Sequence, residues 1–165
     1  ALLTTIHAYT ASQSLVDSVN HKDHRRGRAA AQDIVQSSTG AAVAVALAMP
    51  EFENRFDGIS ARVPVSTGSL VDLTLLVKRS TNQEEINEIL TAAASESRWQ
   101  GIFTATDEPL VSTDIIGNPH AAVADLSLTR VVDGDLVKVC AWYDNEAGYA
   151  NTLIRHVESI GRYIS

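Results

Sequence analysis

Two segments rich in β-branched residues, 127–132 and 136–143, meet at the dipeptide Asp133-Gly134, and this feature constrains the fold most strongly. Aspartate and glycine both tolerate positive φ, which the tight turns of β-hairpins require. We therefore expect the two segments to be neighbouring antiparallel strands. A single hairpin is only marginally stable in water, so other strands and helices must pack around it.

The rest of the chain supplies strands and helices in an irregular order. Ranges rich in β-branched residues predict further strands at 1–10, 58–65, 69–77, 102–104 and 121–124. Gly68 separates two of these ranges and suggests that 58–65 and 69–77 form an antiparallel pair. The polar stretch from about 11 to 38 is expected to be irregular. Strands and helices that do not alternate strictly predict an α+β fold with a largely antiparallel sheet.

Three helices are expected. The alanine-rich run 41–48 has strong helix propensity and stops at Pro50. A second helix starts after Ser80, where capping side chains are followed by carboxylates favoured at the positive end of the helix dipole. A third helix spans about 145–163. Helical spacing gives the second helix a buried stripe formed by Ile86, Ile89, Leu90 and Ala93. It gives the third helix an apolar face formed by Tyr149, Leu153, Val157 and Ile160.

Length and composition exclude several classes of protein. The chain has 165 residues and a net charge of −7, and 45% of its residues are hydrophobic, which is ordinary for one globular domain. No apolar run approaches the roughly 18 residues of a membrane span, and no secretory signal is visible. The single cysteine, Cys140, excludes an internal disulfide and a cysteine-rich zinc site. We expect a cytoplasmic protein without a membrane partner.

One short segment concentrates positive charge. The range 21–28 holds four of the 13 lysine and arginine residues of an acidic chain. Because arginine binds phosphate in a bidentate manner, this segment is a candidate site for small anions. A solvated or intersubunit loop with surface salt bridges is the alternative. Nucleic-acid binding is disfavoured because it needs a wide basic face, and His21 and His24 lack a third metal ligand.

Four segments together resemble a known family. They are His7-Ala8-Tyr9-Thr10, the run 25–31 leading to 37–42, the run 61–64, and the run 142–149. In this order and spacing they resemble the C-terminal catalytic domain of phosphorylating glyceraldehyde-3-phosphate dehydrogenase. The resemblance implies a mostly antiparallel sheet with helices packed on one face. It also implies that residues 1–165 are a catalytic domain truncated at its N-terminus, whose partner is an N-terminal Rossmann domain.

The resemblance assigns roles to individual residues. His7 corresponds to the catalytic histidine, since an imidazole can act as base and acid near neutral pH. The phosphate of glyceraldehyde 3-phosphate would be bound by Thr10 and Arg62. The attacking inorganic phosphate would be bound by Arg26, Thr39 and Gly40. Two alternatives stay open, because Arg25 could replace Arg26 and Thr39 could be an ordinary helix cap.

The cofactor and the assembly are also implied by the resemblance. Asn145 corresponds to the residue that holds the nicotinamide carboxamide of NAD (or NADP), with Tyr149 against the ring. A helix cap is the alternative role for Asn145. The stretch 17–36 corresponds to a loop that lines the cofactor pocket of an adjacent subunit, which implies a homo-tetramer. In this family a cysteine thiolate attacks the aldehyde, hydride passes to NAD, and phosphate releases 1,3-bisphosphoglycerate in glycolysis.

The sequence departs from the family pattern at several positions. The family's nucleophilic cysteine precedes the strand that contains His7 and is absent here. Cys140 lies in a strand pattern and is expected to be a buried, inert thiol. We therefore expect this chain alone to be inactive. Gln36, where the family usually has proline, weakens any statement about substrate preference.

Two other functions stay open at this point. The runs 51–56 and 118–120 resemble the related erythrose-4-phosphate dehydrogenase, whereas Thr39-Gly40 favours the glyceraldehyde enzyme. A non-catalytic phosphate-binding or assembly module would bind phosphate through Arg26 and Arg62 without redox activity. Comparing the turnover of glyceraldehyde 3-phosphate and erythrose 4-phosphate by the full-length parent would distinguish the two dehydrogenases. Phosphate binding without turnover would identify the non-catalytic module.

Overall fold

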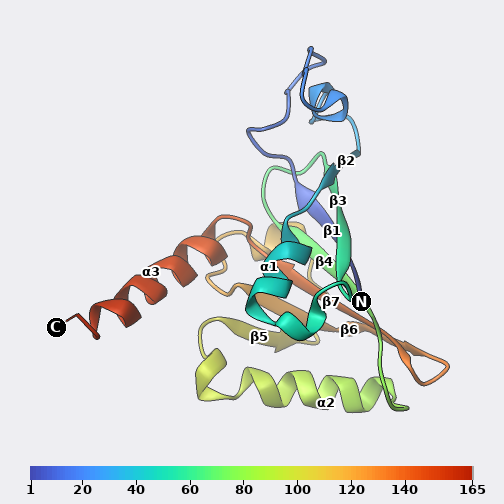
Figure 1. Cartoon of the computed structure of the whole chain (residues 1–165), viewed down its shortest axis with the longest axis vertical. Coiled ribbons are helices and arrows are strands. Elements are labelled where there is room, and N and C mark those ends of the chain that lie inside the picture. Colours follow the sequence, from blue (N-terminus) through green and yellow to red (C-terminus); the bar gives the residue numbers. More distant parts are fainter. Residues whose placement is uncertain (165) are drawn as a thin grey trace.

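The structure is a computed structural model that describes residues 1–164. Its centre is a seven-stranded sheet in the order β2-β3-β1-β4-β7-β6-β5 (Figure 1). The strands are β1 (Leu2–Ala8), β2 (Val35–Ser38), β3 (Asp57–Val63), β4 (Ser69–Leu76), β5 (Phe103–Thr106), β6 (Ala122–Val132) and β7 (Leu136–Tyr143). The helices are α1 (Ala41–Ala48), α2 (Gln83–Ala94) and α3 (Ala147–Gly161), with short 3-10 helices η1 (His24–Gly27), η2 (Pro50–Phe52), η3 (Ser97–Trp99) and η4 (Ser112–Ile115).

The sheet is mixed, but most of its strand pairs are antiparallel. β1 runs parallel to β3 and β5 runs parallel to β6. The other four neighbouring pairs are antiparallel. Helix α1 contacts β3, and α2 contacts β5 and β6. The predicted α+β class with a mostly antiparallel sheet is therefore confirmed.

The expected pairing of 58–65 with 69–77 is wrong. β1 lies between β3 and β4, and its Ile6 is opposite Ala61 on β3 and Leu70 on β4. β3 and β4 run in opposite directions but are not neighbours. Each side of β1 has a partner strand in this position, so its backbone hydrogen-bonding groups are satisfied on both edges.

The hairpin that links β6 to β7 has the predicted turn. Asp133 and Gly134 have φ values of 52° and 78°, the positive values that such a turn requires. β6 is one strand and not the two short strands that were expected. A register shift between Asp125 and Arg130 interrupts the pairing of β6 with β7. This irregularity lies where the sequence predicts a gap between two strands.

Helices α1 and α2 begin where the sequence predicts. The side chain of Asn82 accepts a hydrogen bond from the backbone N–H of Glu85 at 2.8 Å and caps α2. The predicted stripe of α2 is only partly buried, and the side chain of Ile89 is 52% exposed. The stripe is only partly buried because α2 packs against β5 and β6 at one end of the sheet, which leaves part of its apolar face uncovered.

Helix α3 begins at Ala147 and extends away from the sheet (Figure 1). The N-cap position of α3 is Glu146 and not Asn145, and the Asp144 Oδ1 accepts hydrogen bonds from the backbone N–H groups of Glu146 and Ala147. The predicted apolar face of α3 has no cover within the described residues. Its side chains are between 46% and 71% exposed, namely Tyr149, Leu153, Val157 and Ile160.

The polar stretch after β1 projects beyond the end of the sheet and returns as β2 (Figure 1). Asp17 holds this projecting loop together, because its Oδ1 accepts from Arg28 Nε at 3.1 Å and from the Ala29 N–H at 2.9 Å. β2 was not predicted. It is a short edge strand of mixed polarity that pairs only with β3, so its sequence carries no alternating pattern.

Candidate functional site

The pairing of β1 with β3 brings His7 next to Arg62. The two residues are opposite each other in the parallel register, and both side chains are half-buried. Arg62 Nη1 lies 2.6 Å from His7 Nδ1 and 3.2 Å from the carbonyl oxygen of Ala8. Arg62 Nε lies 3.5 Å from the hydroxyl of Ser37 on β2. A titratable ring and an anion-binding cation from distant segments therefore share one site.

The surroundings of His7 favour its neutral form. Burial lowers the pKa of His7, the hydrogen bond to the Ala8 carbonyl opposes this effect, and the charge of Arg62 lowers the pKa further. The pKa of His7 lies below its usual value of 6.5, so the imidazole is uncharged at pH 7. A neutral imidazole has one free lone pair and can accept a proton.

Tyr143 on β7 packs against the same imidazole. The two rings meet edge to face, with centroids 6.0 Å apart and planes at 74°. Burial raises the pKa of the Tyr143 hydroxyl, although its hydrogen bond to Ser69 and the charge of Arg62 act in the opposite direction. The phenol is therefore neutral at pH 7, and its ring limits how far the imidazole can rotate.

Ser69 connects this cluster to Asn145. The Ser69 hydroxyl accepts from the backbone N–H of Ala8 at 3.2 Å and donates to the Asn145 Oδ1 at 3.3 Å. The N–H of Gly68 donates to the same oxygen, also at 3.3 Å. Two donors thus fix the oxygen of the Asn145 amide, which leaves its NH₂ group to donate to a ligand.

Arg26 lies in the projecting loop but acts electrostatically on Arg62. Burial lowers the pKa of Arg62, the nearby Tyr143 raises it, and the positive charge of Arg26 lowers it again. Arg26 forms a 3.2 Å salt bridge with Asp23. Arg25, the alternative to Arg26, is exposed and hydrogen-bonds to Gln36. Two arginines close enough to repel each other form a place where an anion would be stabilised.

The contacts of Thr10, Thr39 and Gly40 are local. Thr10 Oγ1 lies 3.0 Å from the hydroxyl of Ser12, directly after β1. Thr39 Oγ1 accepts from the backbone N–H of Ala41 at 3.2 Å, while the N-cap position of α1 is Gly40. Gly40 has no heavy atom within 4 Å of the position where a Cβ would stand, so a ligand can approach its backbone.

Two other residues lie apart from this cluster. Tyr149 is on the exposed side of α3, 71% accessible to solvent. Cys140 is buried, and burial raises the pKa of its thiol. Side chains alternate between the faces of a strand, so Cys140 and Tyr143 point to opposite faces of β7. The thiol therefore lies on the face of the sheet away from His7.

Sequence reasoning missed Ser69, Tyr143 and Ser37 as parts of this site. Tyr143 and Ser37 lie within runs that carried the resemblance, but neither was singled out. Ser69 follows Gly68 at the start of the predicted strand 69–77, and nothing in the neighbouring sequence marks it as a site residue. Only the register of β1, β4 and β7 places it between Ala8 and Asn145.

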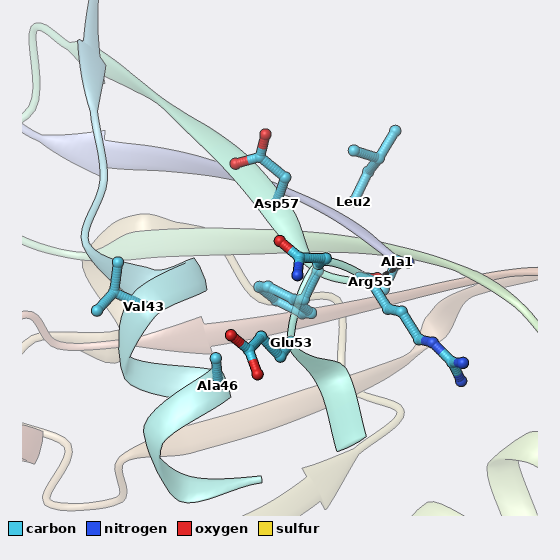
Figure 2. A pocket seen from close by; sticks show the side chains of 9 residues that line it. Ala1, Leu2, Val43, Ala46, Glu53, Arg55 and Asp57 are labelled. Carbon is cyan, nitrogen blue, oxygen red and sulfur yellow. Dashed lines mark hydrogen bonds between the residues drawn. The ribbon is translucent and has the colours of Figure 1, made fainter. Parts of the chain in front are cut away.

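A separate hollow of the described surface lies elsewhere. It has a volume of about 610 Å³ and lies between α1, the segment 53–57 and the start of β1 (Figure 2). The side chain of Glu53 points toward Ala46 there, whereas the guanidinium of Arg55 points outward (Figure 2). None of the predicted site residues lines this hollow, and the side-chain cluster around His7 is the better candidate site.

Residues 1–164 were searched for metal-binding clusters and for membrane-spanning helices. Within this range, no three His, Cys, Asp or Glu side chains are placed to bind one metal ion. No helix of the same range has the length and apolar character needed to cross a bilayer.

Comparison with known proteins agrees with the geometry. Residues 1–145 match the model of the family "Glyceraldehyde 3-phosphate dehydrogenase, C-terminal domain". The chain is 51% identical over 160 residues to glyceraldehyde-3-phosphate dehydrogenase 2 of Streptomyces arenae, covering 97% of this chain and 47% of that protein. It is 49% identical over 161 residues to the enzyme of Mycobacterium avium, covering 98% and 47%. The chain therefore spans about half the length of the curated relatives it matches.

Proposed function

Because this chain belongs to the glyceraldehyde 3-phosphate dehydrogenase C-terminal domain family, we propose that it is the catalytic half of a phosphorylating aldehyde dehydrogenase. The reaction would oxidise glyceraldehyde 3-phosphate with NAD or NADP as the oxidant and add inorganic phosphate, which gives 1,3-bisphosphoglycerate. The observation that carries the proposal is the 2.6 Å contact between Arg62 and His7, which joins an anion-binding group to a proton acceptor. The proposal assigns the glycolytic reaction, a cytoplasmic location and a homo-tetramer to the intact protein.

His7 acts as the base in this proposal. A neutral imidazole at pH 7 can take the proton of a thiol, and later that of the hydroxyl formed when the thiolate attacks the aldehyde. The lowered pKa of His7 supports this role because it keeps the ring uncharged before reaction. Tyr143, in edge-to-face contact, restricts the orientation of the ring.

The two phosphate groups bind to different sets of side chains. Arg62 and Thr10 hold the phosphate of the substrate, and the guanidinium supplies two parallel donors to the phosphate oxygens. Arg26, Thr39 and Gly40 hold inorganic phosphate, with Gly40 offering an unobstructed backbone at the start of α1. The charge interaction between Arg26 and Arg62 supports two neighbouring anion sites.

The residues around Asn145 fit a nicotinamide cofactor, NAD or NADP. The oxygen of the Asn145 amide is held by Gly68 and Ser69, so the NH₂ group can donate to a carboxamide oxygen. Tyr149 is exposed and can pack against a planar ring. A bound nicotinamide would supply the hydride acceptor that the oxidation requires. An N-terminal Rossmann domain supplies most of the cofactor site, and the loop 17–36 lines the pocket of an adjacent subunit.

The chain alone is inactive in this proposal. Cys140 cannot serve as the nucleophile, because it is buried and lies on the face of β7 opposite to Tyr143 and His7. The purified chain should therefore form no NADH from glyceraldehyde 3-phosphate, NAD and phosphate. Turnover by the purified chain would contradict the proposal.

Anion binding tests the proposal directly. Calorimetric titration with glycerol 3-phosphate should detect binding to the chain, and Arg62→Ala should weaken it about 10- to 100-fold through loss of two charge-assisted hydrogen bonds. Arg98→Ala is the matched control, because Arg98 pairs with the neighbouring Glu96 on the surface. Equal binding by Arg62→Ala and the wild type would refute the assignment of the site.

A further inference from the structure

The Nδ1 atom of His7 has two contacts that require opposite protonation states. It lies 2.6 Å from the carbonyl oxygen of Ala8, which can only accept a hydrogen bond. It also lies 2.6 Å from Arg62 Nη1, which can only donate. If Nδ1 carries a proton, it can donate to the Ala8 carbonyl, but it then faces the N–H of Arg62. If Nδ1 has a lone pair, it can accept from Arg62, but it then faces the carbonyl oxygen of Ala8.

We propose that Arg62 is a positioning residue that selects the tautomer of His7, and that the phosphate of the substrate switches this choice. The inference rests on the proposed function, since it assumes that a phosphate monoester binds at Arg62. Without the anion, Arg62 donates to Nδ1, so the single ring proton is on Nε2 and that nitrogen cannot act as a base. With the anion, Nδ1 carries the proton and Nε2 has the free lone pair.

The present contacts of Arg62 allow it to turn toward an anion. Apart from His7, its partners are the Ala8 carbonyl at 3.2 Å and the Ser37 hydroxyl at 3.5 Å, both at the long end of hydrogen bonding. A phosphate dianion offers shorter, charge-assisted bonds to the same guanidinium. The guanidinium of Arg62 should therefore leave His7 Nδ1 when an anion binds, because its bonds to the anion are stronger.

Departure of Arg62 releases Nδ1 to the carbonyl of Ala8. The ring then gives its Nε2 proton to solvent and takes a proton from solvent at Nδ1, with no net change in charge. Arg62 keeps all of its protons throughout. The new N–H donates to Ala8, which is already within hydrogen-bond distance. The base thus forms only when a phosphate is present beside it.

The charged and titratable groups around His7 and Arg62 come from several elements. Arg62 faces the ring from β3, Tyr143 faces it from β7, and Arg26 in the loop repels Arg62. Tyr143 is neutral because burial raises its pKa. The positive charge of Arg62 lowers the pKa of His7, and an anion that neutralises this charge should raise it.

Nitrogen NMR of the imidazole rings tests the switch in the full 165-residue chain. The chemical shift of each ring ¹⁵N distinguishes a protonated, pyrrole-type nitrogen from a pyridine-type one. The chain has five histidines, and His7→Gln identifies the resonances of His7 by their loss. At pH 7.5 we expect Nδ1 to be pyridine-type in the free chain and to become pyrrole-type at saturating glycerol 3-phosphate.

Two variants separate the effect of the charge from that of the fold. Arg62→Met keeps a long side chain but removes the donor, so Nδ1 should be pyrrole-type with and without ligand. Arg98→Met is the matched control on the surface and should keep the wild-type switch. If Nδ1 in Arg62→Met stays pyridine-type, the tautomer does not depend on Arg62 and the inference is wrong.

The ligand titrations distinguish failure of the switch from failure of the proposed function. Glycerol 3-phosphate and inorganic phosphate are added separately, and the amide resonances of Thr10 and Gly40 report which phosphate site is filled. Shifts at Thr10 without a change at His7 would overturn the switch and leave the proposed function intact. No shift at any of these residues with either ligand would overturn both.

Discussion

Replacing Asp144 with asparagine should destabilise the chain strongly, although the two side chains have the same shape. Asp144 is only 4% exposed. Its Oδ1 accepts from the N–H groups of Glu146 at 2.8 Å and Ala147 at 2.9 Å, and its Oδ2 accepts from the Gly117 N–H at 2.8 Å. One carboxylate therefore holds both the start of α3 and the loop after η4.

The size of the effect follows from these three bonds. A hydrogen bond to a charged group contributes about 1.5–3 kcal/mol, and one between neutral groups about 0.5–1.5 kcal/mol. Asparagine keeps the two bonds at Oδ1 in weaker form, but its NH₂ group would face the N–H of Gly117. Allowing for overlap within one network, we expect Asp144→Asn to lower the free energy of unfolding by about 3 kcal/mol at pH 7.

The charge of Asp144 also predicts how this loss depends on pH. Burial raises the pKa of Asp144, but the hydrogen bonds from Gly117, Ala147 and Glu146 outweigh it, and the net shift is downward. A lowered pKa contributes stability that is present above the unfolded-state pKa of about 3.9 and is lost as the pH falls through the folded-state value. The difference between wild type and Asp144→Asn should therefore shrink below pH 4.

Urea unfolding followed by tryptophan fluorescence measures both effects between pH 7 and pH 3. Asp114→Asn is the matched control, because the exposed Asp114 accepts only one bond, from Val111 at 2.8 Å, and should cost less than about 1 kcal/mol. A difference for Asp144→Asn that is below 1 kcal/mol at pH 7 would refute the reasoning. A large difference that does not change with pH would show that the charge is not its source.

Two further predictions concern the site and its turn. The free energy of unfolding should fall as the pH drops below 6.5. The pKa of His7 is lowered in the folded chain, so the unfolded chain binds a proton more readily. Urea titrations of His7→Gln should therefore show a smaller fall. Equal pH dependence of the two proteins would contradict this. Gly68→Ala should cost about 3 kcal/mol or more, because Gly68 has φ +91° and an added Cβ would lie 2.2 Å from the Ser112 carbonyl oxygen. Gly117→Ala, with φ +79° but no atom within 4 Å, should cost only about 1 kcal/mol in the same urea assay, and an equal cost at both glycines would exclude the steric explanation.

Local features of the sequence predicted the elements well. The turn at Asp133-Gly134, the end of α1 before Pro50 and the start of α2 after Asn82 all depend on a few adjacent residues, whose backbone preferences act without help from the fold. The neighbours of β1 could not be predicted in this way. Its pairing with β3 and β4 depends on which distant strand fits each edge, and the local pattern of residues 2–8 is the same in either arrangement.

The candidate site likewise contains residues that short motifs predict and residues that only the fold reveals. His7 and Arg62 were named from short motifs, and the register of β1 and β3 brings them together. A helix cap was the alternative role for Asn145, but the N-cap position is Glu146 and the neighbouring Asp144 accepts from the first N–H groups of α3. Ser69 could not be found from the sequence, because its importance comes from hydrogen bonds to residues 61 and 76 positions away.

The position of β1 has a consequence for how the chain folds. β1 is synthesised before both of the strands between which it lies, and its paired residues in β3 follow more than 50 positions later in the chain. β1 therefore has no partner strand for much of synthesis, and closing such long loops slows folding. Until then its apolar residues are free to associate with other chains. We expect the yield of soluble protein to depend on synthesis rate and on chaperones that bind extended apolar segments.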